Sequence, residues 1–373
     1  MRLAVNARLI VSQRLEGMGL YTVEVIRQIL LQTDFELLML TDRAGDLPEL
    51  PRRVDRQILY PSARHPVLFA AWFELRVPAA LEAWRADAFL SADNFTSLRT
   101  KVPQLLVVHD LAYLHQPEAV GRLQLAYYRY FMPRFARRAE ALVTVSDATR
   151  RDVAEAYDID PADIRVAYNG VRPRFAPLSV SRIAAVRARL TEGAPYFVYV
   201  GAVHPRKNVD GLIRAYSSFR QNTAHAHKLL IAGRFAWQAG PTRAALESSP
   251  FRADVHLLGY VEEAELGEVI GAATGLALVS HFEGFGVPVL EALTCGVPVV
   301  ASASSSLPEV AGPGGLLVDP ADDDAIAEAL ARLAGDDDLC EVLAKAGRQH
   351  AEQFTWARAG AVIVEALRTL YAP

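Results

Sequence analysis

Two glutamates, Glu283 and Glu291, flank a Gly-Phe-Gly turn at residues 284–286. Pro288 follows this turn, and proline suits the first turn of a helix, where its missing N–H loses no hydrogen bond. Gly296 favours the end of such a helix, because glycine readily adopts the left-handed conformation found there. The sequence therefore predicts a loop, a short helix and then a buried strand.

The entrance of this predicted helix is suited to a phosphate group. Backbone N–H groups at a helix N-terminus have no partners within the helix, and glycines let an anion approach them. The candidates for this anion site are Gly284, Phe285, Gly286 and Val287. Glu291 lies about one turn into the helix, where its carboxylate can accept hydrogen bonds from the hydroxyls of a sugar or a ribose.

A second candidate site follows the apolar run at residues 197–200. Gly201 comes directly after this predicted strand, and Arg206 and Lys207 follow in the same loop. Ligands of parallel α/β sheets bind at the carboxyl ends of strands. Two cations there would neutralise the charge of a bound diphosphate group. The alternative is that both cations are solvated at the surface.

The segment EGFGVPVLEALTCGVPVV, with its two glutamates spaced E-x7-E, resembles the donor-site signature of the family 4 retaining glycosyltransferases. Residues 201–208 are similar to the G-x-x-x-x-R-K-N motif of the same family. This resemblance implies that Arg206, Lys207 and the glycine turn hold the donor diphosphate. It also implies that Glu291 binds the ribose hydroxyls and that Glu283 binds hydroxyls of the transferred sugar.

Two features of the first half fit this resemblance. Gly17 and Gly19 lie between the apolar run at 3–5 and a predicted helix, and such a loop is either a phosphate-binding loop or a simple tight turn. The resemblance implies a glycine loop that closes over the donor diphosphate. His109 follows the run at 105–108, and the resemblance places it near the transferred sugar. The alternative is a histidine that caps the end of the strand.

Apolar runs alternate with helical stretches along the chain, which predicts doubly wound parallel sheets in an α/β protein. The length of 373 residues suits two domains. The resemblance spans essentially the whole chain and implies the GT-B fold, in which two Rossmann-like domains face a central cleft. The expected parts are an acceptor-side domain at 1–172, a linker and nucleotide-sugar-binding domain at 173–355, and a C-terminal helix at 356–373 that crosses back to the first domain.

Composition narrows the class of protein. A charged fraction of 22% and a hydrophobic fraction of 51% are those of a globular protein, and no uninterrupted apolar run predicts a membrane span. With no leader pattern and only two cysteines, the sequence predicts a cytoplasmic protein. The net charge of −4 argues against binding nucleic acid.

No metal or other cofactor is expected. The aspartate runs at 322–324 and 336–338 fall at predicted helix starts, where acidic residues favour the helix dipole. The resemblance also implies a reaction that generally needs no divalent metal.

The stretch at 121–138 combines five arginines with aromatic residues and contains no acidic residue. It is either an amphipathic helix with core aromatics and solvated arginines, or a peripheral contact with an anionic membrane or a lipid-linked acceptor. Pro133 is expected to interrupt any long helical face.

The predicted function is retaining transfer of a sugar to a glycan or lipid-linked acceptor. The sequence is most similar to bacterial mannosyltransferases of polysaccharide and O-antigen synthesis, which makes GDP-mannose the preferred donor and a UDP-sugar the second choice. Two other classes stay open: a nucleotide-sugar epimerase of the same fold, and a non-catalytic nucleotide-sugar-binding partner.

Overall fold

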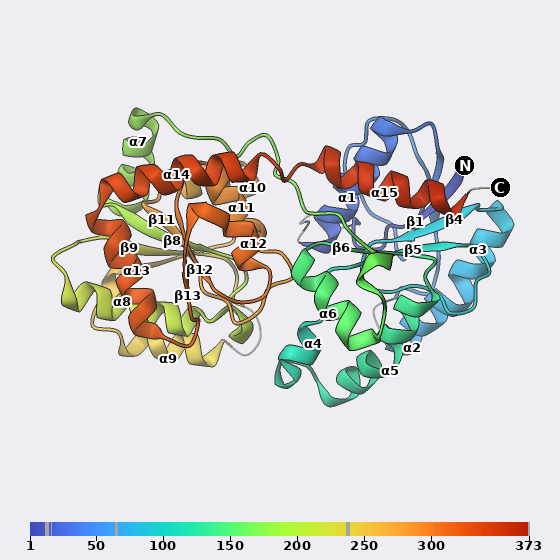
Figure 1. Cartoon of the computed structure of the whole chain (residues 1–373), viewed down its shortest axis with the longest axis horizontal. Helices are drawn as coiled ribbons and strands as arrows, with labels where there is room; N and C mark the ends of the chain where they lie inside the picture. Colours follow the sequence, from blue (N-terminus) through green and yellow to red (C-terminus); the bar gives the residue numbers. More distant parts are fainter. Residues whose placement is uncertain (12–14, 16, 64–65, 236–238, 372–373) are drawn as a thin grey trace. The chain divides into compact units, whose positions relative to one another are not determined.

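The structure is a computed structural model that describes residues 1–11, 15, 17–63, 66–235 and 239–371. The chain forms two compact units, of which the first is Met1–Gly170 together with Phe354–Pro373 and the second is Val171–Gln353. Each unit contains one parallel sheet with helices around it, so the predicted α/β class with two parallel sheets is confirmed (Figure 1).

The sheet of the first unit has seven strands in the order β3-β2-β1-β4-β5-β6-β7, and every neighbouring pair is parallel. The strands β4, β5 and β6 are buried along their whole length, because helices cover both faces of a parallel sheet. The strands are β1 (Arg2–Asn6), β2 (Glu36–Thr41), β3 (Asp55–Ile58), β4 (Ala88–Ser91), β5 (Gln104–Val108), β6 (Ala141–Thr144) and β7 (Ile164–Val166).

The C-terminal helix belongs to the first unit and lies beside α1 (Figure 1). Gln32 Nε2 donates to the carbonyl of Ala357 at 3.0 Å. Gly360 lets the two helices approach, since a Cβ there would meet Gln28 Cβ at 2.3 Å. The α-helices of this unit are α1 (Met18–Gln32), α2 (Pro66–Ala71), α3 (Val77–Trp84), α4 (Ala112–His115), α5 (Arg122–Arg138), α6 (Asp147–Tyr157) and α15 (Trp356–Leu370).

The sheet of the second unit has six parallel strands in the order β10-β9-β8-β11-β12-β13. Its strands are β8 (Tyr196–Val200), β9 (Lys228–Ala232), β10 (Val255–Gly259), β11 (Gly275–Leu278), β12 (Val299–Ser302) and β13 (Gly315–Val318). Its α-helices are α7 (Val180–Thr191), α8 (Val209–Asn222), α9 (Gly240–Ser248), α10 (Glu263–Gly271), α11 (Val287–Thr294), α12 (Leu307–Ala311), α13 (Asp323–Gly335) and α14 (Asp337–Ala351). Among its short 3₁₀ helices, η4 (Pro205–Lys207) follows β8, and the others are η5 (Arg252–Asp254) and η6 (Gly312–Gly314).

The predicted loop, helix and strand around Pro288 are confirmed by α11 and β12. Pro288 lies in the first turn of α11, and Gly296 has a φ of 74° just beyond its end. Gly296 N–H donates to Leu293 O at 3.0 Å and Val297 N–H donates to Ala292 O at 2.9 Å. These two bonds form a Schellman motif, so the helix ends where the glycine predicted it to end.

One expectation about helix boundaries is wrong and another is confirmed. Pro133 does not interrupt α5, which continues from Arg122 to Arg138 with this proline inside it. Proline removes a single backbone donor, and the buried side chains of Met132 and Phe135 still pack on this face.

The aspartate runs lie at helix starts as predicted, since Asp322 and Asp336 cap α13 and α14. No described helix is both long enough and apolar enough to span a bilayer.

Candidate active site

Two cationic side chains and a carboxylate meet at the carboxyl edge of the second sheet. β8 and β11 are hydrogen-bonded neighbours, so the loops that follow them begin side by side. Lys207 Nζ, after β8, lies 2.5 Å from Oε1 of Glu283, which follows β11. Arg206 Nη1 lies 3.6 Å from Oε2 of the same carboxylate. The structure therefore brings together three predicted site residues from two motifs that are 76 residues apart.

Backbone contacts hold the two loops against each other. The N–H of His281 donates to the carbonyl of Arg206 at 2.9 Å, and Arg206 Nη1 donates to the carbonyl of Phe282 at 2.9 Å. Asn208 Nδ2 donates to the carbonyl of Val279 at 3.1 Å. The cationic pair is consequently presented by a rigid loop junction, which suits a site that must position charge before the ligand arrives.

Three serines fix Glu283, a contact that the sequence alone did not predict. Ser280 Oγ donates to Glu283 Oε1 at 2.6 Å, and Ser306 Oγ donates to the carbonyl of Glu283 at 2.9 Å. The N–H of Glu283 donates to Ser305 Oγ at 3.0 Å. The sequence signal was the serine run at 304–306, but nothing local in that run indicates which residue it contacts.

The charge state of Glu283 follows from its neighbours. Burial by itself raises the pKa of this carboxyl, but Lys207 and Arg206 outweigh burial and hold the pKa below its usual range. Glu283 is therefore ionised at neutral pH, and it neutralises part of the charge of the cationic pair. A diphosphate brought to Lys207 would compete with Glu283 for the same ammonium group.

The entrance of α11 offers fewer backbone donors than the sequence suggested. Val289 N–H already donates to Gly286 O at 2.9 Å, and Pro288 has no N–H. Gly286 has a φ of 96°, and a Cβ there would meet Leu307 Cδ2 at 2.4 Å. The backbone donors at the helix start are thus the N–H groups of Gly286 and Val287, and the side chain of Phe285 is buried beside them.

Gly201 is placed as predicted, directly after β8, but its N–H has a role in the sheet. This N–H donates to the carbonyl of Ala232 at 2.9 Å. Gly201 can therefore give a ligand space, but it does not offer its own donor. Gly233 lies close by, since a Cβ on Gly233 would overlap Gly201 O at 1.7 Å.

Glu291 lies in a second, separate cluster of the same unit. Its side chain is buried, and Arg172 Nη2 lies 3.8 Å from its Oε1. Arg172 also contacts Glu263 at the start of α10, and Arg174 Nη1 lies 3.1 Å from the same Glu263. Burial raises the pKa of Glu291 to about 7, against the opposing effect of the two arginines. The sequence prediction assigned Arg172 no role and placed it at the end of the acceptor-side domain, 1–172.

His109 and its neighbours occupy the carboxyl edge of the first sheet. His109 Nε2 donates to Ala92 O at 2.9 Å, and Asn94 Oδ1 accepts from His109 N–H at 2.6 Å. The ring of Tyr21 meets the imidazole edge-on at 5.0 Å between centroids. Burial lowers the pKa of His109, so the ring is neutral near pH 7, with Nδ1 as its acceptor. Its carbonyl accepts from Thr149 Oγ1 at 3.3 Å.

The two glycines of the first unit have different roles at the start of α1. Gly17 is the N-cap residue with a φ of 43°, and a Cβ there would meet nothing within 4 Å. A Cβ on Gly19 would lie 3.0 Å from the carbonyl oxygen of Leu9. Gly17 is thus required by backbone conformation and leaves open space above the helix start, whereas Gly19 is required by close packing.

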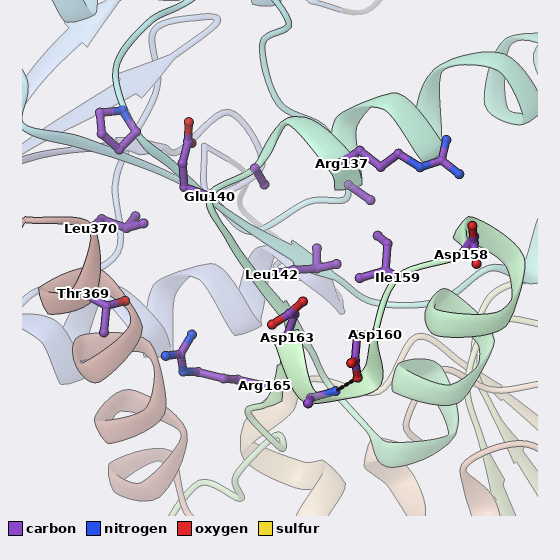
Figure 2. Close-up of a pocket in the computed structure, with 14 residues that line it drawn as sticks. Arg137, Glu140, Leu142, Asp158, Ile159, Asp160, Asp163, Arg165, Thr369 and Leu370 are labelled. Atoms are coloured by element: carbon purple, nitrogen blue, oxygen red, sulfur yellow. Dashed lines mark hydrogen bonds between the residues drawn. The ribbon is translucent and has the colours of Figure 1, made fainter.

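A hollow of about 870 Å³ in the first unit lies away from this edge. Its border includes Glu140 and Asp163, which directly precede β6 and β7, and Thr369 near the end of α15 (Figure 2). Arg165 extends across it toward α15. Acidic residues line this hollow, but no group of three or more His, Cys, Asp or Glu side chains in the described residues is arranged to bind a metal ion. The hollow is at the amino end of β6 and β7, so it is separate from His109.

Comparison with known proteins assigns the chain to a family. Residues 15–175 match the model described as "Glycosyltransferase Family 4", and residues 183–350 match "Glycosyl transferases group 1". Together the two matches cover most of both units. The chain is a family 4 glycosyltransferase.

Two of the curated proteins that this glycosyltransferase resembles differ in how much of the chain they match. O-antigen chain mannosyltransferase B of Escherichia coli is 27% identical over 371 residues, which cover 95% of this chain and 97% of that protein. D-inositol 3-phosphate glycosyltransferase of Saccharomonospora viridis is 32% identical over 248 residues, which cover 62% of this chain and 56% of that protein. The first relation extends over both units, whereas the second spans only about half of the relative.

Solved structures give the fold of this glycosyltransferase. Sucrose-phosphate synthase from Thermosynechococcus elongatus has a TM-score of 0.79 at 19% identity and covers 99% of both chains. WaaG, a glycosyltransferase involved in lipopolysaccharide biosynthesis, has a TM-score of 0.78 at 18% identity and covers 100% of both chains. The GT-B prediction is confirmed by these similarities.

Proposed function

We propose that this glycosyltransferase transfers mannose from GDP-mannose, with retention of anomeric configuration, to a glycan or lipid-linked acceptor in the cytoplasmic synthesis of a cell-surface polysaccharide. The observation that carries the choice of sugar is the relation to the O-antigen chain mannosyltransferase, which extends over 95% of this chain and 97% of the relative.

The cluster of Arg206, Lys207 and Glu283 supports binding of a diphosphate. In the absence of donor, Glu283 occupies Lys207, so the ammonium group keeps its position without a ligand. When the donor binds, its phosphates take over Lys207 and Arg206, and the N–H groups at the start of α11 add partial positive charge. The charge that develops on the leaving diphosphate is then stabilised by groups already in place.

Glu283, once released from Lys207, accepts hydrogen bonds from hydroxyls of the mannose. Glu291 accepts from the ribose hydroxyls, and neutral His109 accepts or directs a sugar hydroxyl. Gly17 and Gly19 form the loop that approaches the diphosphate. No side chain is assigned as a nucleophile. The leaving phosphate itself removes the acceptor proton on the face from which it departs, and no divalent metal is required.

Calorimetric titration tests this proposal directly. The purified protein, without added metal, is titrated with GDP, UDP, GDP-mannose and UDP-glucose. We expect binding of GDP and GDP-mannose only, lost in Lys207→Ala and retained in Lys345→Ala, which removes the same charge from an exposed position on α14. Incubation with a mannosyl acceptor should then yield a glycosidic product, which an epimerase would not form.

The other results each redirect the proposal. Selective binding of UDP would keep the diphosphate site and exclude GDP-mannose as the donor. Nucleotide binding without any glycosidic product would favour the epimerase or the non-catalytic partner. No nucleotide binding at all would overturn the assignment of Arg206 and Lys207.

A peripheral membrane contact through residues 121–138 would bring the enzyme to a lipid-linked acceptor. Leu123 and Tyr130 on α5 are 87% and 54% exposed, and they lie among the arginines of the same helix. Cationic and apolar groups on one exposed helix suit an anionic lipid surface. We expect co-sedimentation with vesicles containing anionic lipid, reduced in Leu123→Ser but not in Leu75→Ser, which changes a 53% exposed leucine of the same unit. Equal binding to neutral vesicles would contradict this contact.

A further inference from the structure

The segment that begins the second unit is fastened to the cluster around Glu291. Arg172 and Arg174 both contact Glu263. Phe175 of the same segment packs against α10 and is 3% exposed. The carbonyl of Arg174 packs closely against α10, because a Cβ on Gly267 would lie 3.1 Å from its oxygen. Arg172 therefore has a defined position relative to both α10 and α11.

Glu291 can accept hydrogen bonds from both ribose hydroxyls only as an ionised carboxylate whose oxygens have free lone pairs. A protonated carboxyl would offer one donor and fewer acceptor sites to the two hydroxyls of a ribose. Burial works against ionisation, because a charge without a partner is costly in a dry environment. A group that favours the charged form must therefore act on Glu291, and it must do so without occupying the oxygens that the ribose needs.

Arg172 satisfies both conditions. Its Nη2 is 3.8 Å from Glu291 Oε1, which is close enough for strong Coulombic attraction but longer than a hydrogen bond. Its tight partner is Glu263, which holds the guanidinium to one side. We propose that Arg172 is a positioning residue that keeps Glu291 ionised and unobstructed for the ribose of the donor. This inference rests on the proposed role of Glu291 in ribose binding.

The other charged groups around Glu291 are few. Arg174 adds a weaker favourable charge, and Glu263 at the start of α10 pairs with both arginines. The thiol of Cys295 lies near, since burial and then the charge of Glu291 raise the pKa of this thiol to about 12. From α14, Arg348 packs against Gly296 just beyond the end of α11, and the charges that act on the pKa of Glu291 are those of Arg172 and Arg174.

Ionisation of Glu291 should make donor binding depend on pH. The pKa of Glu291 is about 7, so its ribose-binding form is lost as the pH falls through that value. Removing Arg172 takes away an attraction that favours the charged form, and the pKa then rises further. Donor binding should therefore need a higher pH in the variant, and it should recover once the pH is high enough.

The experiment measures GDP affinity by calorimetry between pH 5.5 and 9, and it uses UDP if that is the nucleotide the protein binds. Arg172→Met should move the pH midpoint of binding up by about one unit, which makes binding roughly fivefold weaker at pH 7 and nearly normal at pH 9. Arg182→Met, an exposed arginine paired with Glu268 in the same unit, should bind as the unaltered protein does. An unchanged midpoint in Arg172→Met would overturn the inference.

A second variant separates charge from obstruction. Glu263→Gln frees Arg172 to bind Glu291 directly, so we expect the midpoint to move down while binding becomes several-fold weaker at every pH. A merely structural role for Arg172 would weaken binding in both variants without moving either midpoint, and that outcome would also contradict the inference.

The 2′-deoxy nucleotide distinguishes failure of this inference from failure of the ribose assignment. The unaltered protein should bind 2′-deoxy-GDP more weakly and with little pH dependence, and Glu291→Gln should bind GDP equally weakly. If GDP and its deoxy form bind alike, the ribose role of Glu291 fails and the role of Arg172 fails with it. If they differ but Arg172→Met titrates normally, only the role of Arg172 is wrong.

Discussion

The carboxyl edges of the two sheets are built from different chemistry. At the edge of the second sheet, Lys207, Arg206 and Glu283 form a charged cluster in which ion pairs satisfy the side chains. At the edge of the first sheet, His109 is neutral, and backbone groups of Ala92 and the side chain of Asn94 fix it. An ion pair can be exchanged for another charge, whereas a buried neutral ring with satisfied hydrogen bonds only orients its surroundings. The second edge is therefore suited to a charged ligand and the first to an uncharged one.

The strongest test of this comparison is Lys207→Ala. It removes the ammonium group that we assign to the diphosphate, so we expect kcat/KM to fall by about 100-fold or more. His109→Gln keeps a donor that can reach the carbonyl of Ala92, and it should lower kcat/KM by only about tenfold, a value within the range of single acid–base groups. Steady-state kinetics on both variants checks the order, and equal losses would remove the distinction between the two edges.

Gly286 tests how strongly the helix entrance is constrained. Gly286→Ala places a Cβ 2.4 Å from Leu307 Cδ2 at a φ of 96°. Gly193→Ala has a similar φ of 92° but meets nothing within 4 Å. Strain alone should lower the free energy of unfolding by about 1 kcal/mol in Gly193→Ala, and steric overlap should roughly double or triple that loss in Gly286→Ala. Urea unfolding measures both. Equal losses would mean that Leu307 moves aside freely.

The pH dependence of His109 gives a smaller effect on stability. Because burial lowers the pKa of His109 in the folded state, the unfolded chain binds more protons as the pH falls below the ordinary histidine value. His109 should therefore reduce the free energy of unfolding below about pH 6.5, the usual histidine pKa. In His109→Gln that part of the pH dependence should disappear. Urea unfolding at pH 5.5 and 7.5 checks this, and an identical slope in both proteins would contradict the burial of a neutral ring.

The smallest effect is expected at the glycine loop of the first unit. Gly17→Ala faces open space, so it should lower the free energy of unfolding by only about 1 kcal/mol through its positive φ. Thermal unfolding measures this loss. If donor affinity falls more than tenfold while the loss of stability stays that small, Gly17 contacts the donor. Unchanged affinity would leave it as a helix cap alone.

The local sequence pattern was enough to predict the helices and strands that carry the candidate active site. Pro288 marks the start of α11 and Gly296 marks its end, and the apolar run before Gly201 forms β8. These elements could be predicted because capping and burial preferences act within a few residues. The composition of the motifs also predicted the family, since more than a dozen consecutive residues match a single signature. In contrast, Pro133 misled the prediction for α5, because the packing of Met132 and Phe135 outweighed one lost hydrogen bond.

Only the tertiary structure decided which charges meet. Lys207 reaches Glu283 because β8 and β11 are neighbours in a parallel sheet, and their loops therefore leave the same edge. Arg172 reaches Glu291 because the segment after Gly170 packs on α10 and α11 rather than crossing solvent. A sequence gives the type and order of these side chains, but the distance between charges far apart in the chain depends on strand order and packing, which local patterns do not contain.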